Sequence, residues 1–138
     1  MSKILTIKGK VFSGSGEGAE FIELPWVKKQ IVQRLGFVPY TGTLNIKLTV
    51  QSILIKKSLK NANAIEISPI KGFCRGRCFP VGFMQDLKCA IVIPEVENYP
   101  EDVIEVIAPV NLREKFKLKD GDMVEFRIML DQFYCCAF

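Results

Sequence analysis

The sequence has 138 residues, of which 49% are hydrophobic and 25% charged, and this balance predicts one globular domain over residues 1–138. It contains no histidine, which excludes mechanisms that use imidazole as a base or metal ligand. Its net charge of +4 comes from scattered Lys and Arg, so a nucleic-acid-binding patch is not expected. No apolar run approaches the about 20 residues of a membrane helix, and no secretory signal is visible, so a cytoplasmic location without membrane contact is expected.

The five cysteines do not form a metal or disulfide pattern. Their spacing is not of the C-x-x-C kind, and no histidine could complete a mixed zinc site. We interpret them as small apolar residues that stay reduced. They are Cys74, Cys78, Cys89, Cys135 and Cys136.

A glycine-rich segment follows the first predicted strand, 3–12. Alternate glycines let the backbone approach a ligand closely, and successive free N–H groups can hold phosphate oxygens. The segment is neither a Walker loop nor a dinucleotide fingerprint, and a flexible hairpin loop is the alternative interpretation. Its residues are Gly14, Ser15, Gly16, Glu17, Gly18 and Ala19.

Residues 25–35 predict a helix. Pro25 suits a first helical position, and Gly36 suits a helix end. Apolar residues repeat between them at helical spacing, which predicts a helix packed against a sheet. We assign this helix no chemistry.

From Thr43 to Val50 the apolar residues alternate, which predicts a strand. Thr43 and Asn45 then emerge from the same face, and both carry neutral oxygen ligands suitable for Mg²⁺. Such a site would hold the ion firmly only if phosphates completed its shell. The alternative interpretation is a polar strand edge exposed to solvent.

The remaining chain is mostly strand. Short strands, one helix and no βαβ rhythm predict a mainly β fold, a small closed β-barrel with one packed α-helix and short helical turns. A helical turn is predicted at 112–115 and a tight turn at 119–122. The further strands are predicted at 64–68, 78–83, 88–93, 103–107 and 123–130.

A third segment, 105–113, runs from a strand through a proline to Arg113, a fixed cation able to grip phosphate. A strand-to-turn junction with a surface arginine is the alternative.

Taken together, these segments resemble the archaeal CTP-dependent riboflavin kinases. The resemblance rests on Gly-x-Gly-Glu-Gly, Leu-Gly-Phe-x-Pro-Tyr-x-Gly-Thr-Leu-Asn, Ile-Ala-Pro-x-x-Leu-Arg and Lys-Asp-Gly-Asp, which occur in order. They occupy residues 14–18, 35–45, 107–113 and 119–122, with family spacing, and the similarity covers essentially the whole chain.

The resemblance implies a six-stranded barrel of the cradle-loop (RIFT) type. It implies a kinase that moves the γ-phosphate of CTP to the 5′-hydroxyl of riboflavin and gives FMN and CDP. Mg²⁺ is the implied cofactor, one ion per site, and a monomer is expected. By position, Thr43 and Asn45 would hold the metal, and Glu105 would contact the flavin. Residues 14–19 with Val110, Asn111, Leu112 and Arg113 would bind the nucleotide.

Phosphoryl transfer without histidine leaves a carboxylate or bulk water as proton acceptor, and Glu105 is the candidate catalytic residue.

The chain departs from the family pattern between Pro94 and Glu105. A family run like Arg-Thr-His-His, whose threonine contacts the phosphate end of FMN, is replaced here by residues 96–99. Glu97, the aligned flavin-binding position, would repel a phosphate unless the loop turns away. A remodelled loop, another acceptor and lost activity are the alternatives. A barrel that binds nucleotide or flavin without transfer, and a DNA-binding regulator, are the competing function hypotheses.

Overall fold

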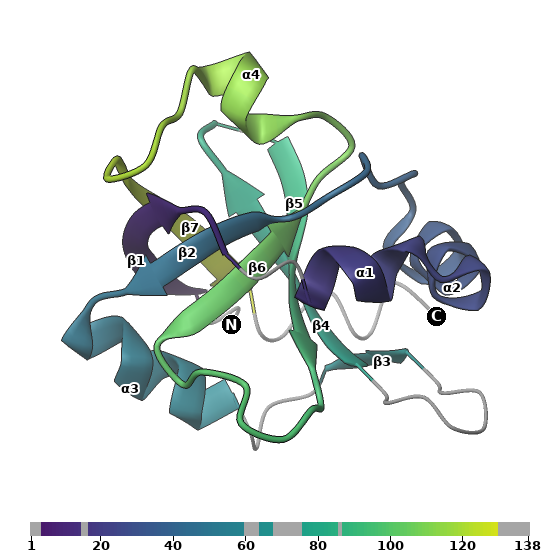
Figure 1. Ribbon diagram of the computed structural model, residues 1–138, viewed down its shortest axis with the longest axis horizontal. Helices are drawn as coiled ribbons and strands as arrows, with labels where there is room; N and C mark the ends of the chain where they lie inside the picture. Colours follow the sequence, from purple (N-terminus) through teal and green to yellow (C-terminus); the bar gives the residue numbers. More distant parts are fainter. Residues whose placement is uncertain (1–3, 15–16, 60–63, 68–75, 86, 130–138) are drawn as a thin grey trace.

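The computed structural model describes residues 4–14, 17–59, 64–67, 76–85 and 87–129. Seven strands and four helices make up this part of the chain (Figure 1). The strands are β1 (Ile4–Phe12), β2 (Leu44–Leu48), β3 (Ile65–Ile67), β4 (Gly76–Phe83), β5 (Leu87–Pro94), β6 (Val103–Ile107) and β7 (Met123–Met129). The helices are α1 (Glu17–Glu23), α2 (Pro25–Leu35), α3 (Val50–Ser58) and α4 (Leu112–Phe116).

Six of the strands close into an antiparallel barrel. Neighbours in the sheet follow the order β3-β4-β5-β6-β2-β1-β7, and β7 also pairs with β4. In that closing pair Val81 lies opposite Ile128 and Phe83 opposite Phe126. Among the described strands, β3 stands outside the ring and pairs with β4. The predicted closed six-stranded β-barrel is confirmed.

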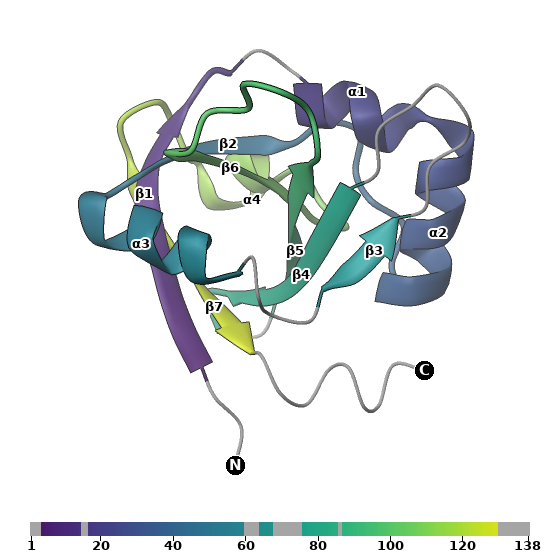
Figure 2. The same cartoon turned by 90° about the horizontal axis from the view of Figure 1, so that it is seen from below.

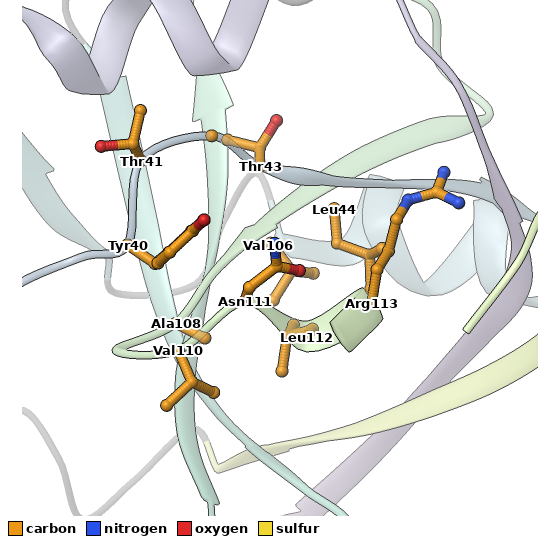
Figure 3. Close-up of a pocket in the computed structure, with 11 residues that line it drawn as sticks. Tyr40, Thr41, Thr43, Leu44, Val106, Ala108, Val110, Asn111, Leu112 and Arg113 are labelled. Carbon is orange, nitrogen blue, oxygen red and sulfur yellow. The ribbon is translucent and has the colours of Figure 1, made fainter. Parts of the chain in front are cut away.

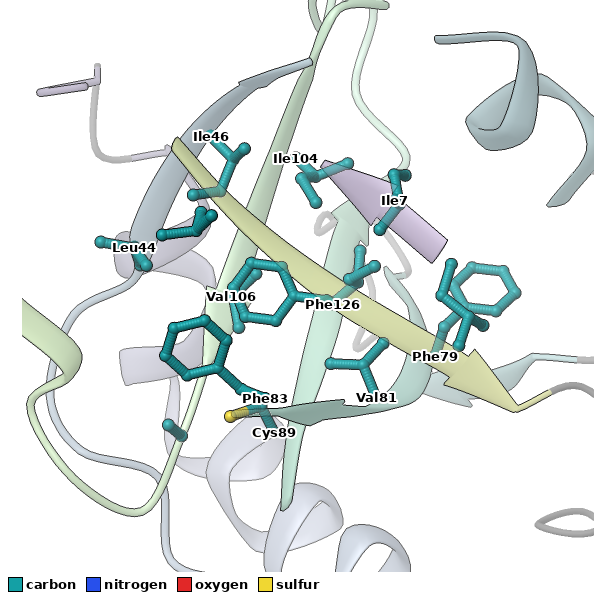
Figure 4. Packing of buried hydrophobic residues seen from close by; sticks show 14 of the residues in the cluster. Ile7, Leu44, Ile46, Phe79, Val81, Phe83, Cys89, Ile104, Val106 and Phe126 are labelled. Atoms are coloured by element: carbon teal, nitrogen blue, oxygen red, sulfur yellow. The ribbon is translucent and has the colours of Figure 1, made fainter. Parts of the chain in front are cut away.

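The barrel interior is filled by the inward-facing residues of every strand. On β1, Ile7 and Val11 are buried while the alternate residues Lys8 and Lys10 face solvent. Phe83 stacks on Phe126, with ring centroids 4.7 Å apart, and Figure 4 shows both among aliphatic side chains. Full burial of each such side chain contributes about 1.5–3 kcal/mol, so this core fixes the barrel on which the site is built.

A second apolar cluster attaches the first two helices to the outside of the barrel. Ile22 of α1 and Val27 and Ile31 of α2 are buried against Cys78, Ala90, Val92 and Ile107. Helix α2 has Pro25 at its start and ends at Gly36, whose φ of 83° is the left-handed conformation that glycine adopts easily. The predicted helix 25–35 is confirmed. Figures 1 and 2 show α1 and α2 on one side of the barrel and α3 on another.

Two parts of the prediction were wrong. The strand predicted from Thr43 to Val50 ends at Leu48, and Val50 begins α3. Thr49 caps that helix by accepting a hydrogen bond from the backbone N–H of Ser52 at 3.3 Å, which stops the strand. The glycine-rich segment is also shorter than predicted, because α1 begins at Glu17 and includes Gly18 and Ala19.

The other predicted strands and the helical turn at 112–115 are confirmed over the described residues, outside which Lys3, Ser68 and Leu130 lie. Cys78 and Cys89 are buried free thiols, while Cys74, Cys135 and Cys136 lie outside the described residues. Burial raises the pKa of each of these two thiols to about 12, which suits inert core residues. None of the described helices is long and apolar enough to cross a membrane.

Candidate functional site

Three of the predicted segments meet where β1, β2 and β6 lie side by side. Asn45 on β2 pairs with Phe12 at the end of β1 and with Glu105 on β6. The barrel therefore brings the start of the glycine-rich segment, the Thr43–Asn45 pair and the predicted catalytic residue together, although they are far apart in sequence.

Glu105 is the centre of this arrangement. Its side chain is buried, with 2% exposure, in a strand of otherwise apolar residues. The Thr43 hydroxyl donates a hydrogen bond to Oε1 at 2.6 Å, and the Tyr99 hydroxyl donates to Oε2 at 2.6 Å. Short bonds from two hydroxyls offset the cost of burying the carboxylate.

Thr43 and Asn45 fit the metal-ligand role implied by the resemblance. The Thr43 hydroxyl directs its proton to Glu105, so the lone pairs of its oxygen stay available for a cation. Asn45 makes no side-chain hydrogen bond to the described residues, and its amide lies against Gly14. No cluster of three or more acidic or cysteine side chains occurs in the described ranges, so further ligands for a cation here would come from a bound phosphate or water.

Gly14 is required by this close approach. A Cβ atom at position 14 would lie 2.4 Å from Asn45 Oδ1, far inside van der Waals contact. The glycine therefore lets the chain leave β1 directly over the β2 amide. Ser15 and Gly16 lie outside the described residues, and the side chain of Glu17 is not described.

Arg113 joins the 110–113 segment to the same end of the barrel. Asn111 caps α4 by accepting a hydrogen bond from the backbone N–H of Glu114 at 3.2 Å. In the next turn, Arg113 Nη2 donates to the backbone carbonyl of Phe12 at 3.2 Å and to Asp120 Oδ1 at 2.8 Å. Ser13 also donates to Asp120, at 3.1 Å. The hydrogen bond from Arg113, and then that from Ser13, hold the pKa of Asp120 below its usual range.

A cavity of about 150 Å³ lies between these segments. Its walls are residues 40–44 and 110–113, with Val106 and Ala108. Figure 3 shows the two segments on opposite sides of it, with Val106 between them. The cavity therefore contains five of the predicted site residues, namely Thr43, Val110, Asn111, Leu112 and Arg113. We call it the nucleotide-side cavity.

A second cavity, of about 400 Å³, lies on the Tyr99 side of Glu105, and the sequence did not predict it. Its lining combines apolar, basic and acidic residues, including Leu59, Ile93, Val96, Lys56, Arg77, Glu95 and Glu101. We call it the Tyr99-side cavity. Tyr99 lines it and bonds Glu105, while Thr43 lines the nucleotide-side cavity and bonds the same carboxylate. Glu105 thus accepts a hydrogen bond from one lining residue of each cavity.

Glu97 is the predicted site residue that the structure does not bring to this centre. It is exposed in the β5–β6 connection and lines neither cavity. Asn98, the next residue, has a φ of 63°. Its neighbours Val96 and Tyr99 do line the Tyr99-side cavity, so the loop turns Glu97 outward. Sequence reasoning did not predict Tyr99 as a site residue. The only sequence signal for it was its position within residues 96–99, where the chain departs from the family pattern.

Comparisons with known proteins agree with this geometry. The model of a family named for CTP-dependent riboflavin kinase, and described as a domain of unknown function (DUF120), matches residues 11–128. The chain is 41% identical over 125 residues to the riboflavin kinase of Methanosarcina barkeri, covering 88% of this chain and 55% of that protein. It is 43% identical over 130 residues to the riboflavin kinase of Pyrobaculum islandicum, covering 92% of this chain and 62% of that protein.

A third riboflavin kinase, from Archaeoglobus fulgidus, is 41% identical over 134 residues, which cover 91% of this chain and 55% of that protein. The chain thus spans little more than half the length of the curated relatives it matches. The matched residues include both cavities and the five barrel strands β2, β4, β5, β6 and β7 except Met129, but only Val11 and Phe12 of β1. This chain belongs to the CTP-dependent riboflavin kinase domain family.

Proposed function

We propose that this domain transfers the γ-phosphoryl group of CTP to the 5′-hydroxyl of riboflavin, giving FMN and CDP. The observation that carries the proposal is the position of Glu105, which is bonded to one side chain of each cavity. Two substrates bound on either side of Glu105 would have their reacting groups near Thr43, which is the positioning that phosphoryl transfer needs. The curated riboflavin kinases that resemble this chain support the choice of acceptor.

The nucleotide would occupy the nucleotide-side cavity. Among the described residues, Arg113 bonds Phe12 and Asp120 through Nη2, which leaves Nη1 and Nε of its guanidinium for phosphate oxygens. The backbone at Gly14 passes close to Asn45, so a phosphate near the glycine-rich segment would also lie near the Asn45 amide. The name of the matching family favours CTP as the donor.

A Mg²⁺ ion would be held by Thr43 and Asn45 together with the phosphates. Bound there, Mg²⁺ would neutralise charge on the phosphate oxygens. The chain's own contribution is the orientation of Thr43, whose hydroxyl donates a hydrogen bond to Glu105. Asn45 adds an amide oxygen from the next outward position on the same strand.

The flavin would enter through the Tyr99-side cavity, with its ribityl chain directed toward Glu105. This cavity has apolar walls, basic side chains and the acidic residues Glu95 and Glu101, and the mixture suits a flat ring with polar edges. Glu97 faces away, so its charge does not oppose a phosphate formed near Glu105. In the transfer, the bond between the 5′-oxygen and the γ-phosphorus forms, the bond to the β-phosphate oxygen breaks, and the hydroxyl proton leaves. Glu105 is the candidate acceptor for that proton.

The test is to incubate the folded protein with riboflavin, Mg²⁺ and either CTP or ATP, and to separate the products by chromatography. FMN formed with CTP, with little or none from ATP, is the expected result. CTP binding without FMN from either donor would instead identify a nucleotide-binding module. Glu105→Gln with near-normal turnover would remove Glu105 from the role of proton acceptor while leaving the kinase proposal in place.

A further inference from the structure

Tyr99 lies in the stretch where this chain departs from the family pattern, yet it is firmly held in the site. It is half-buried in the β5–β6 connection, and its hydroxyl donates to Glu105 Oε2 at 2.6 Å. Glu105 is 2% exposed, so water has almost no access to this bond. A bond of this length to a buried carboxylate fixes both side chains.

Lys56 of α3 holds the Tyr99 ring in place through a contact with the ring itself. Its ammonium donates to the backbone carbonyls of Pro100 at 3.0 Å and Val103 at 2.7 Å, which flank the end of the connection. The same ammonium lies 5.1 Å from the centroid of the Tyr99 ring, within cation–π range. Burial lowers the pKa of Lys56, and the nearby carboxylates of Asp102 and Glu101 oppose that shift. A partly desolvated lysine therefore ties α3 to the connection that presents Tyr99.

The effect of this contact reaches Thr43 through the two oxygens of one carboxylate. With Tyr99 on Oε2, Glu105 presents Oε1 to the Thr43 hydroxyl at 2.6 Å. Rotation of the carboxylate would break both bonds, so each bond opposes the loss of the other. As long as Oε1 accepts the hydrogen bond from the Thr43 hydroxyl, the lone pairs of the Thr43 oxygen cannot turn away from the nucleotide-side cavity.

We infer that Tyr99 is a positioning residue that, through Glu105, orients the Thr43 oxygen toward a divalent cation. The inference rests on the proposed function for the metal role of Thr43, and it adds a residue and a relay that the resemblance does not imply. Tyr99 itself contacts no metal in this scheme. Partners one shell beyond the ligands typically change metal affinity by about 10–100-fold, and Tyr99 acts one bond further out.

The test is Mn²⁺ binding to the protein with CDP present and no riboflavin, followed by electron paramagnetic resonance. Tyr99→Phe is expected to weaken Mn²⁺ binding by about tenfold, the low end of the range for outer partners. The affinity of Tyr99→Phe for CDP without metal should stay unchanged, whereas a general disturbance of the site would change it. Ser58→Ala is the matched control, since it also deletes a hydroxyl, one that donates to the Ile55 carbonyl at the end of α3.

A double-mutant cycle with Glu105→Leu tests whether Tyr99 acts through Glu105. In the Glu105→Leu background the Tyr99→Phe change should have almost no further effect on Mn²⁺ affinity. Full additivity of the two changes, or Tyr99→Phe binding Mn²⁺ as tightly as the unmodified protein, would overturn the inference.

Two further outcomes separate this inference from the proposed function. Should the unmodified protein bind Mn²⁺ with CDP but form no FMN, a weakened Tyr99→Phe would still uphold the positioning role while the kinase proposal fails. Should Tyr99→Phe not fold, Lys56→Met is the second variant, because it removes the Lys56 ammonium and keeps the Tyr99 hydroxyl. It too must weaken Mn²⁺ binding. Unchanged binding in folded Lys56→Met would then count against the inference.

Discussion

The two sides of the site are held in place by different means. On the nucleotide side, Arg113 and Ser13 meet Asp120, whose side chain is 57% exposed, and the contacts are polar and near solvent. On the other side, Tyr99 and Thr43 meet a carboxylate that is 2% exposed. Exposed contacts are weakened by water and salt, whereas buried ones are not. The side around Arg113 and Asp120 can therefore adjust to a bound molecule more easily than the buried centre near Glu105.

Thr43 belongs to both sides, so its loss should have the largest effect. Thr43→Ala is expected to lower the rate of FMN formation by about 100-fold or more, because it removes the proposed metal ligand and one donor to Glu105. The rate is measured by chromatography at saturating CTP. Thr43→Ser keeps the hydroxyl and should retain most of the activity. An alanine variant within threefold of the unmodified protein would show that Thr43 is no ligand.

Disturbing the contact between Gly14 and Asn45 should have the second largest effect. Gly14→Ala would push a methyl group against the Asn45 amide and should destabilise the protein by about 1–3 kcal/mol. We also expect the KM for CTP to rise by about tenfold. Gly36→Ala is the control, because its φ of 83° makes it costly while nothing lies within 4 Å. Chemical denaturation and initial rates give both quantities. Equal KM values for the two variants would contradict the close approach.

The exposed side should respond more weakly. Asp120→Asn is expected to raise the KM for CTP by about threefold, since Arg113 and Ser13 lose a charged partner, with Glu125→Gln as the exposed control. Because the Asp120 pKa lies below its usual range, its contribution is present above about pH 4 and is lost as the pH falls through the lowered value. The KM ratio of variant to unmodified protein should therefore stay constant between about pH 5 and 9. A ratio that changes within that window would assign the effect to another group.

The smallest effect is expected for an ion pair outside both cavities. Lys47 and Asp102 approach to 3.2 Å with side chains 59% and 32% exposed. Lys47→Met should change the free energy of unfolding by less than about 0.5 kcal/mol in a urea titration and leave Mn²⁺ and CTP binding unaltered. A loss above 1 kcal/mol would mean that exposure is a poor guide to the strength of contacts in this molecule.

Sequence patterns predicted the features that are local. Alternation of apolar residues predicted β2 and β7, and Pro25 with Gly36 marked the ends of α2. Helix α3 was missed because Ile53, Leu54 and Ile55 are consecutive and give no helical period, although Thr49 and Ser52 are typical of a helix start.

The site divides in the same way. Thr43, Asn45 and Arg113 stand in contiguous motifs and could be identified there. Tyr99 could not, since its bond to Glu105 depends on how the β5–β6 connection folds back over the barrel. The position of Lys56 likewise depends on α3 packing beside that connection. The metal role of Thr43 and Asn45, and the catalytic role of Glu105, stay predictions until they are measured.

Strand β7 determines when the barrel can close during folding. It pairs with β1 and with β4, so that Ile128 lies opposite both Leu5 and Val81. Closing the ring thus requires contacts between the beginning, the middle and the end of the described chain, and such long-range contacts slow folding. Neither β1, which leads into Ser13 and Gly14, nor β4, beside the Tyr99-side cavity, has its full set of neighbours until β7 is in place. During synthesis, the barrel therefore cannot close before β7 has left the ribosome.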